Sequence, residues 1–106
     1  MKILFDQGTP APLRLFLPQH DVATAYERAW ATLKNGELLA AAEEAGFTVF
    51  VTTDTNLIHQ QNLSTRRIAV VVLSTTSWPR IRASADLVVQ AVNRAAAGSY
   101  SDVRIP

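Results

Sequence analysis

The 106-residue sequence predicts a single α/β domain in which a small, mostly parallel β-sheet carries helices on both faces. Short apolar and β-branched runs alternate with segments whose apolar residues recur every three or four positions. The run at residues 68–73 is continuously apolar, which is typical of a strand covered on both faces. One core suits this length, because a chain of this size buries roughly 65% of its unfolded surface.

The composition is that of a folded protein without a strong overall charge. Hydrophobic residues make up 48% of the chain and charged residues 18%, which argues against intrinsic disorder. The net charge is only +1, so any nucleic-acid contact must come from local clustering. The absence of cysteine excludes disulfides and thiolate chemistry. The first apolar run ends at Asp6, which is too short for a signal peptide or a membrane span, and we expect a soluble, cytoplasmic protein.

The first strand and the first helix are predicted close to the N-terminus. Residues 2–5 form a short apolar run, which predicts the strand. Thr9 is a suitable N-cap and Pro10 fits a first helical turn, so a helix is expected to begin here. Pro18 ends this helix. Its predicted inner face comprises Leu13, Phe16 and Leu17.

The middle of the chain is predicted to form a weak strand, a helix and a third strand. Residues 21–25 form the weak strand, and residues 26–32 form a short helix or an irregular loop. Asn35 is expected to cap the next helix, and Gly46 to follow it in the left-handed conformation. The buried stripe of this helix comprises Leu38, Leu39, Ala42 and Ala45. Residues 48–52 are β-branched and aromatic, which predicts the third strand.

The last part of the chain is predicted to form a helical turn, a buried strand, a long helix and an edge strand. The turn covers residues 56–61 and the buried strand residues 68–73, followed by a polar loop at 74–77. The long helix runs over residues 79–97, and the edge strand covers residues 103–105. The inward positions predicted for the long helix are Ile81, Ala85, Val88, Val92 and Ala96.

Two acidic residues follow predicted strands, at the edge where parallel sheets bind ligands. Asp6 comes directly after the first strand, and Asp54 lies in the polar segment after the third. Neighbouring strands lie about 5 Å apart, so two acids at adjacent strand ends repel each other unless a cation offsets their charge. Magnesium needs only one or two protein carboxylates, which makes it a candidate ligand. The alternative is that both residues simply cap the following turns.

Other polar residues near these strand ends also have two interpretations. Asn35 and Glu37 open the middle helix and would either join the two aspartates or only cap the helix. Arg80 and Arg82 lie in the predicted first turn of the long helix, where positive charge opposes the helix dipole. They are therefore candidates for phosphate binding, or part of a solvated surface. Ser77 is a candidate phosphate donor, or a plain helix cap.

The order and spacing of these motifs resemble the PIN-like domains of unknown function in prokaryotes, which are related to toxin-type PIN ribonucleases. The resemblance covers nearly the whole chain and depends on KILFDQ at residues 2–7 and VTTDTNL at residues 51–57. It implies a three-layer PIN-like fold and a ribonuclease that depends on Mg²⁺ or Mn²⁺. It also implies a role as the toxin of a toxin–antitoxin pair, with RNA and a small antitoxin-like protein as partners.

The resemblance assigns roles residue by residue. Asp6 and Asp54 match the catalytic, metal-binding acids of the family. Asn35 and Asn56 stand where relatives often carry Asp, and an amide can bind a metal only through its neutral carbonyl oxygen. Glu37 is the candidate for a third charge, although it is offset by two positions. Two amides in place of acids favour the alternative of a catalytically weakened or inactive module that binds a protein partner or nucleic acid.

Two further expectations concern partners and chemistry. A small α/β domain with this hydrophobic content is expected to leave an apolar helix face exposed, so we favour a homodimer over a monomer. No membrane association is expected. A phosphatase built on the same architecture would need a nucleophile motif, and the sequence contains none.

Overall fold

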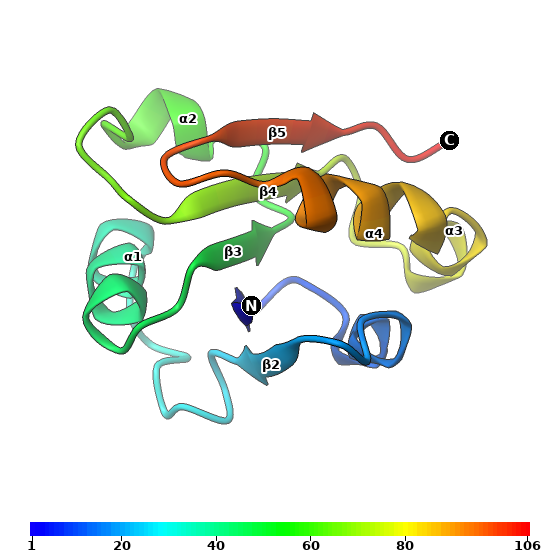
Figure 1. The fold of residues 1–106 in the computed structure, drawn as a ribbon, viewed down its shortest axis with the longest axis horizontal. Helices are drawn as coiled ribbons and strands as arrows, with labels where there is room; N and C mark the ends of the chain where they lie inside the picture. Colours follow the sequence, from blue (N-terminus) through cyan, green and yellow to red (C-terminus); the bar gives the residue numbers. More distant parts are fainter.

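The computed structural model describes all 106 residues, apart from the side chains of Ile58 and Gln60. Five parallel strands form one sheet in the order β2-β1-β3-β4-β5 (Figure 1). The strands are β1 (Lys2–Phe5), β2 (Asp21–Thr24), β3 (Val49–Thr52), β4 (Ala69–Leu73) and β5 (Tyr100–Val103). The predicted α/β class is confirmed, and all of the strands are parallel.

Helical segments cover both faces of the sheet. The 3₁₀ helix η1 (Ala11–Phe16), α3 (Trp78–Ala83) and α4 (Ala85–Arg94) contribute to the core on one face. The helices α1 (Asn35–Glu44) and α2 (Leu57–Gln60) contribute to the core on the other. The chain therefore forms three layers, as the sequence predicts (Figure 1). All the helices described here are too short or too polar to cross a membrane.

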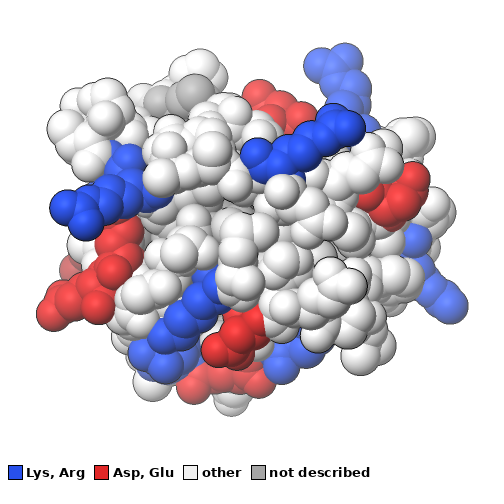
Figure 2. Space-filling view, viewed as in Figure 1, with Lys and Arg blue, Asp and Glu red and all other residues white. Residues whose placement is uncertain are grey.

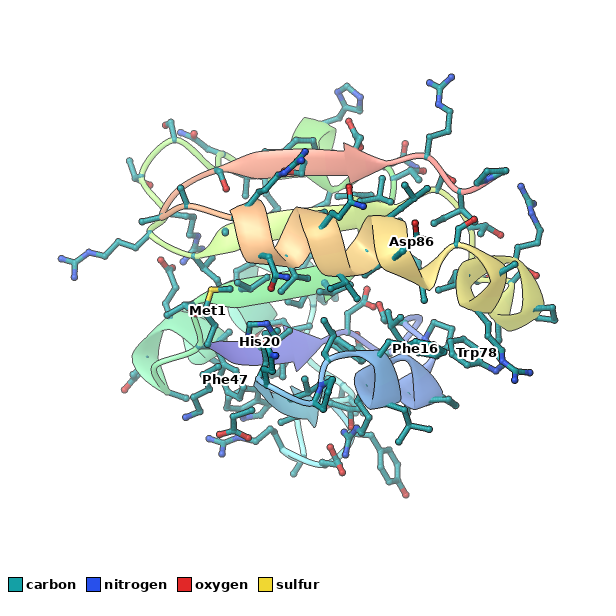
Figure 3. All side chains as sticks on the ribbon, turned by 45° about the vertical axis from the view of Figure 1, so that its right-hand side comes forward. Met1, Phe16, His20, Phe47, Trp78 and Asp86 are labelled. Carbon is teal, nitrogen blue, oxygen red and sulfur yellow. The ribbon has the colours of Figure 1, made fainter. Side chains whose placement is uncertain are left out.

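Alternate side chains of the strands enter two separate cores. On β1, Ile3 and Phe5 enter the core shared with α4, whereas Leu4 enters the core shared with α1. Every residue of β4 is buried, which confirms that the apolar run at 68–73 marks a strand covered on both faces. At the edge of the first core, the rings of Phe16 and Trp78 lie side by side with centroids 6.1 Å apart (Figure 3).

The long helix predicted over residues 79–97 is two helices in the structure. Ser84 separates α3 from α4, with φ −122° and ψ 29°, values outside the helical range. The second helix ends at Arg94, so Ala96 is exposed and the inward position predicted for it is wrong. Gly98 has a positive φ of 75° in the loop that leads to β5. The three alanines at 95–97 favour a helix by propensity, but the chain does not continue the helix through them.

Two other predicted boundaries also change, at the last strand and at the start of α1. The last strand begins at Tyr100 rather than at residue 103, because its backbone pairs with Val70–Leu73 of β4. Residues 26–32 form turns, which agrees with the irregular loop that was one of the two alternatives. The N-cap of α1 is Lys34, and Asn35 is the first helical residue. Gly46 follows this helix with φ 87°, which confirms the left-handed position.

The position of β1 between β2 and β3 gives a testable consequence for stability. Leu4 of this strand is fully buried, so Leu4→Ala is expected to lower the free energy of unfolding by roughly 2–5 kcal/mol. The matched variant Leu15→Ala truncates a residue that is 76% exposed. It is expected to change the free energy of unfolding by less than about 0.5 kcal/mol. Urea denaturation measures both values. Equal effects of the two variants would contradict the assigned core.

Candidate functional site

The candidate site lies beyond the carboxyl ends of β1 and β3. The strand order reverses between these two neighbours, and open parallel sheets bind ligands at such a point. Phe5 pairs with Val51, so the next residues, Asp6 and Thr52, lie at the same level, where β1 has ended and Thr52 completes β3 by pairing with Val72 of β4. The backbone amide of Asp6 donates to the Val51 carbonyl at 3.1 Å, which extends the pairing by one residue. The ends of β1 and β3 therefore lie next to each other, as predicted.

Asp6 is buried, with 7% of its surface exposed, and its carboxylate accepts three hydrogen bonds. Oδ1 accepts from the Thr9 amide at 3.0 Å and from the Thr9 hydroxyl at 2.6 Å. Oδ2 accepts from the Thr52 hydroxyl at 2.5 Å. Among the side chains that the structure describes, no Lys, Arg or His forms an ion pair with Asp6. The carboxylate is thus oriented by neutral donors and has no counter-charge.

Thr52 connects the two aspartates. Its hydroxyl donates to Oδ2 of Asp6 and accepts the backbone N–H of Asp54 at 3.0 Å. Within the described part of the chain, the buried polar or charged residues are Asp6, Thr9 and Thr52, and the hydrogen bonds join all three. Buried polar groups are costly unless they are paired. The fold therefore concentrates its buried polarity at this one place.

Asp54 is half-buried and accepts hydrogen bonds on both oxygens. Asn35 donates its side-chain Nδ2 to Oδ2 of Asp54 at 2.6 Å, so α1 begins beside this strand end. The backbone amide of Asn56 donates to Oδ1 at 3.0 Å, which closes a short turn after β3. The structure thus brings together Asp6, Asp54 and Asn35, with Asn56 contributing its backbone.

The remaining lone pairs determine whether a cation fits here. Each carboxylate oxygen has two acceptor positions. Oδ1 of Asp6 accepts two hydrogen bonds, whereas Oδ2 of Asp6 and both oxygens of Asp54 accept one each. Three acceptor positions therefore remain. Within the described residues no group of three or more His, Asp or Glu side chains is arranged to hold a metal ion. The donor set fits Mg²⁺ or Mn²⁺ only in the mode that uses one or two carboxylates.

Four other predicted site residues form no hydrogen bond or ion pair with these carboxylates among the described side chains. Glu37 accepts a hydrogen bond from the Lys34 amide at 3.3 Å, so it caps the start of α1. Arg80 donates to the carbonyl of Ile105 at 3.1 Å and to Pro106 at 3.0 Å, and holds the end of the chain. Ser77 is the N-cap of α3 without a side-chain capping bond, and Arg82 is exposed.

The sequence interpretation missed the roles of the two threonines. Thr9 was expected to cap η1, but Pro10 precedes this helix and the Thr9 hydroxyl faces Asp6 and the Val51 carbonyl. Thr52 reads as an ordinary β-branched strand residue. A signal for Thr52 exists: it continues the face of β3 that Phe50 occupies, where an apolar side chain would be expected.

Tyr100 lies near Asp54 and binds a third carboxylate, that of Asp102. Its hydroxyl donates to Oδ1 of Asp102 at 3.2 Å. Burial raises the pKa of Tyr100, and the negative charges of Asp102 and Asp54 raise it further. The phenol therefore stays protonated at neutral pH and remains a hydrogen-bond donor on this side of the sheet.

An open groove gives solvent access to Asp6. It has a volume of about 760 Å³ and passes between η1 and the residues that follow β2. Its rim carries Leu15 and Tyr26, which are 76% and 82% exposed. Gly8 lies at its inner end, where a Cβ atom would stand 2.5 Å from the Thr53 hydroxyl oxygen. The loops after β1 and β3 can approach this closely only because residue 8 is glycine.

Comparisons of the chain with protein-family models, with curated proteins and with solved structures find no match. The PIN-like interpretation therefore stays a prediction. It depends on the two motifs in the sequence and on the geometry that they adopt.

The ion pair on the groove wall gives a prediction for pH. The hydrogen bond from Arg14 lowers the pKa of Glu27 to about 2, with a further contribution from the Thr24 amide. Because folding lowers this pKa, the stabilisation is complete above the ordinary glutamate pKa and is lost as the pH falls towards 2. Arg14→Met is expected to raise the Glu27 pKa towards its ordinary value, which an NMR titration measures. A midpoint that stays near 2 in this variant would contradict the assignment.

Proposed function

We propose that the chain is a PIN-like, metal-dependent endoribonuclease that uses Mg²⁺ or Mn²⁺ at Asp6 and Asp54. The observation that carries this proposal is the buried Asp6 carboxylate, which is 7% exposed and has no ion-pair partner among the described side chains. A buried charge is costly unless it is paired or coordinates a metal. A divalent cation would supply the missing positive charge between the two aspartates.

The chain's own residues define what such a site would do. Asp6 and Asp54 would hold the ion, and the side-chain carbonyl oxygens of Asn35 and Asn56, two residues hydrogen-bonded to Asp54, would be its candidate neutral ligands. When bound, the ion would activate water and stabilise the charge that develops on a phosphodiester. Thr52 fixes the relative placement of the two carboxylates through its two hydrogen bonds. The groove beside Asp6 would admit the polynucleotide.

The surface charge limits how such a substrate would be held. Acidic and basic side chains are mixed over the face shown in Figure 2, without one broad basic area. The formal net charge is +1. Weak electrostatic attraction to the phosphate backbone is therefore expected, with local recognition near the cleavage site. Arg82 is exposed and stays a candidate for phosphate, whereas Arg80 is engaged by the chain end.

A specific hydrogen bond favours the second candidate function, a PIN-like module that binds a partner without cutting RNA. The Asn35 amide occupies one acceptor position of Asp54 at 2.6 Å and adds no negative charge. A site with two charges instead of four attracts a cation less strongly. The partner would then be nucleic acid or a small antitoxin-like protein. The toxin role and the homodimer also stay predictions.

The nuclease proposal is tested by cleavage of a labelled mixed RNA pool with Mn²⁺, Mg²⁺ or EDTA. The wild-type protein is expected to cut only with metal. Asp54→Ala removes a proposed ligand of the ion, and the ion would supply several kcal/mol of charge stabilisation, so cleavage is expected to fall by at least about 100-fold. Asp86→Ala, an exposed acid of α4, is the matched control and should cut like the wild type (Figure 3).

Thermal unfolding shows whether each variant is folded. Undiminished cleavage by folded Asp54→Ala would overturn the assigned site. A folded wild type that binds RNA but never cuts it would favour the binding module.

A second test adds one carboxylate to the site, at position 35. Asn35→Asp places an acid beside Asp54, so Mn²⁺ affinity is expected to rise by about tenfold, because affinity follows the charge of the ligands. Without metal the like charges repel each other, and the melting temperature in EDTA is expected to fall. Calorimetric titration with MnCl₂ and thermal unfolding measure the two effects. Asn93→Asp, an equal charge change on α4, is the control, and a similar gain in that variant would show that the effect is nonspecific.

A further inference from the structure

Two buried threonines give the two oxygens of Asp6 different surroundings. Oδ1 accepts both the amide and the hydroxyl of Thr9, at 3.0 and 2.6 Å, which uses both of its acceptor positions. Oδ2 accepts only the Thr52 hydroxyl, at 2.5 Å, and keeps one position. The carboxylate is therefore asymmetric: only one of its oxygens can take another ligand without losing a hydrogen bond.

Thr9 lies against both Asp6 and β3. The single proton of its hydroxyl is directed at Oδ1 of Asp6, at 2.6 Å, and the Val51 carbonyl, at 3.1 Å, is the longer contact of the same hydroxyl. Thr9 is buried, with 5% of its surface exposed. Rotation of the Asp6 carboxylate would break the two bonds on Oδ1, and buried acceptors are costly to leave unpaired. The orientation of Asp6 is therefore set before any ligand arrives.

We propose that Thr9 is a positioning residue that makes Asp6 bind a divalent cation through Oδ2 alone, and that it thereby selects Mg²⁺ or Mn²⁺ over Ca²⁺. This inference rests on the proposed metal site. Magnesium requires near-octahedral geometry, to which each carboxylate contributes one oxygen. Calcium takes six to eight oxygens and often binds a carboxylate through both of them. Because both acceptor positions of Oδ1 are occupied, Asp6 is not available to bind calcium through both of its oxygens.

Thr52 extends the same constraint to Asp54. Its oxygen accepts the Asp54 amide at 3.0 Å while its hydrogen points to Asp6. The free oxygen of Asp6 and the start of the turn that carries Asp54 are consequently fixed relative to each other. Asp6 would hold a cation through the acceptor position that Oδ2 keeps.

The test measures binding of Mn²⁺ and of Ca²⁺, each alone, to the wild type and to Thr9→Val, Thr9→Ser and Thr48→Val. Valine keeps the shape of threonine and the amide bond but removes the hydroxyl. Loss of a group that orients a ligand typically costs 10–100-fold in metal affinity. We expect Thr9→Val to bind Mn²⁺ about tenfold more weakly, with a smaller loss for Ca²⁺, so that the preference for Mn²⁺ narrows. Thr9→Ser keeps a hydroxyl and should restore the preference for Mn²⁺.

Thr48→Val is the matched control, because the Thr48 hydroxyl lies 3.4 Å from the Lys2 carbonyl at the opposite ends of the strands. If the role of Thr9 were purely structural, Thr9→Val would lower the stability of the protein without changing the ratio of its Mn²⁺ and Ca²⁺ affinities. Unchanged affinities in folded Thr9→Val would overturn this inference alone. Absence of binding of either ion to the wild type would overturn the metal site itself. If Thr9→Val does not fold, Thr9→Ala replaces it, and failure of both to fold would assign Thr9 to the fold and overturn the proposal.

Discussion

Parallel pairing between β1 and β3 is the constraint on which the candidate site depends. The register places Phe5 opposite Val51, so Asp6 and Thr52 reach the edge of the sheet together. The Thr52 hydroxyl can then bond Asp6 and accept the Asp54 amide at the same time. A shift of this register by one residue would turn Thr52 to the other face of the sheet and break both bonds. The apolar residues that fix the register, on alternating faces of β1 and β3, therefore also fix the geometry of the polar site.

The same hydrogen bonds explain how the fold accommodates a buried acid. A hydrogen bond to a charged group contributes about 1.5–3 kcal/mol, whereas the effective cost of burying an ion is several kcal/mol. Three donors on Asp6 offset much of this cost, but none of them carries a charge. These bonds orient the carboxylate but leave its charge without a compensating positive group among the described side chains. Its negative charge remains available to a ligand that enters from the groove.

The sequence was sufficient to predict the layered fold and the placement of Asp6 and Asp54 after neighbouring strands, because both follow from short-range patterns. Apolar runs mark the strands, and an acid after a strand has only one edge of the sheet to occupy. Glu37 and Arg80 were harder to place, because each has a nearby backbone partner that the sequence does not reveal: the Lys34 amide for one and the end of the chain for the other. The break at Ser84 and the functions of Thr9 and Thr52 likewise depend on tertiary neighbours rather than on local propensity.

Asn35 changes how this site would respond to a cation. In a cluster of carboxylates, the like charges disfavour one another unless a metal or protons neutralise them. Here the amide of Asn35 donates to Asp54, and the turn after β3 is closed by the Asn56 amide. Hydrogen bonds therefore supply the order that a metal would otherwise provide, and the geometry of the site does not depend on occupancy. An uncharged donor in this position reduces attraction for the ion but preserves the arrangement of the two aspartates. Under the proposed function, the domain would hold its binding surface in shape at all times, and cleavage would be limited by cation affinity rather than by folding.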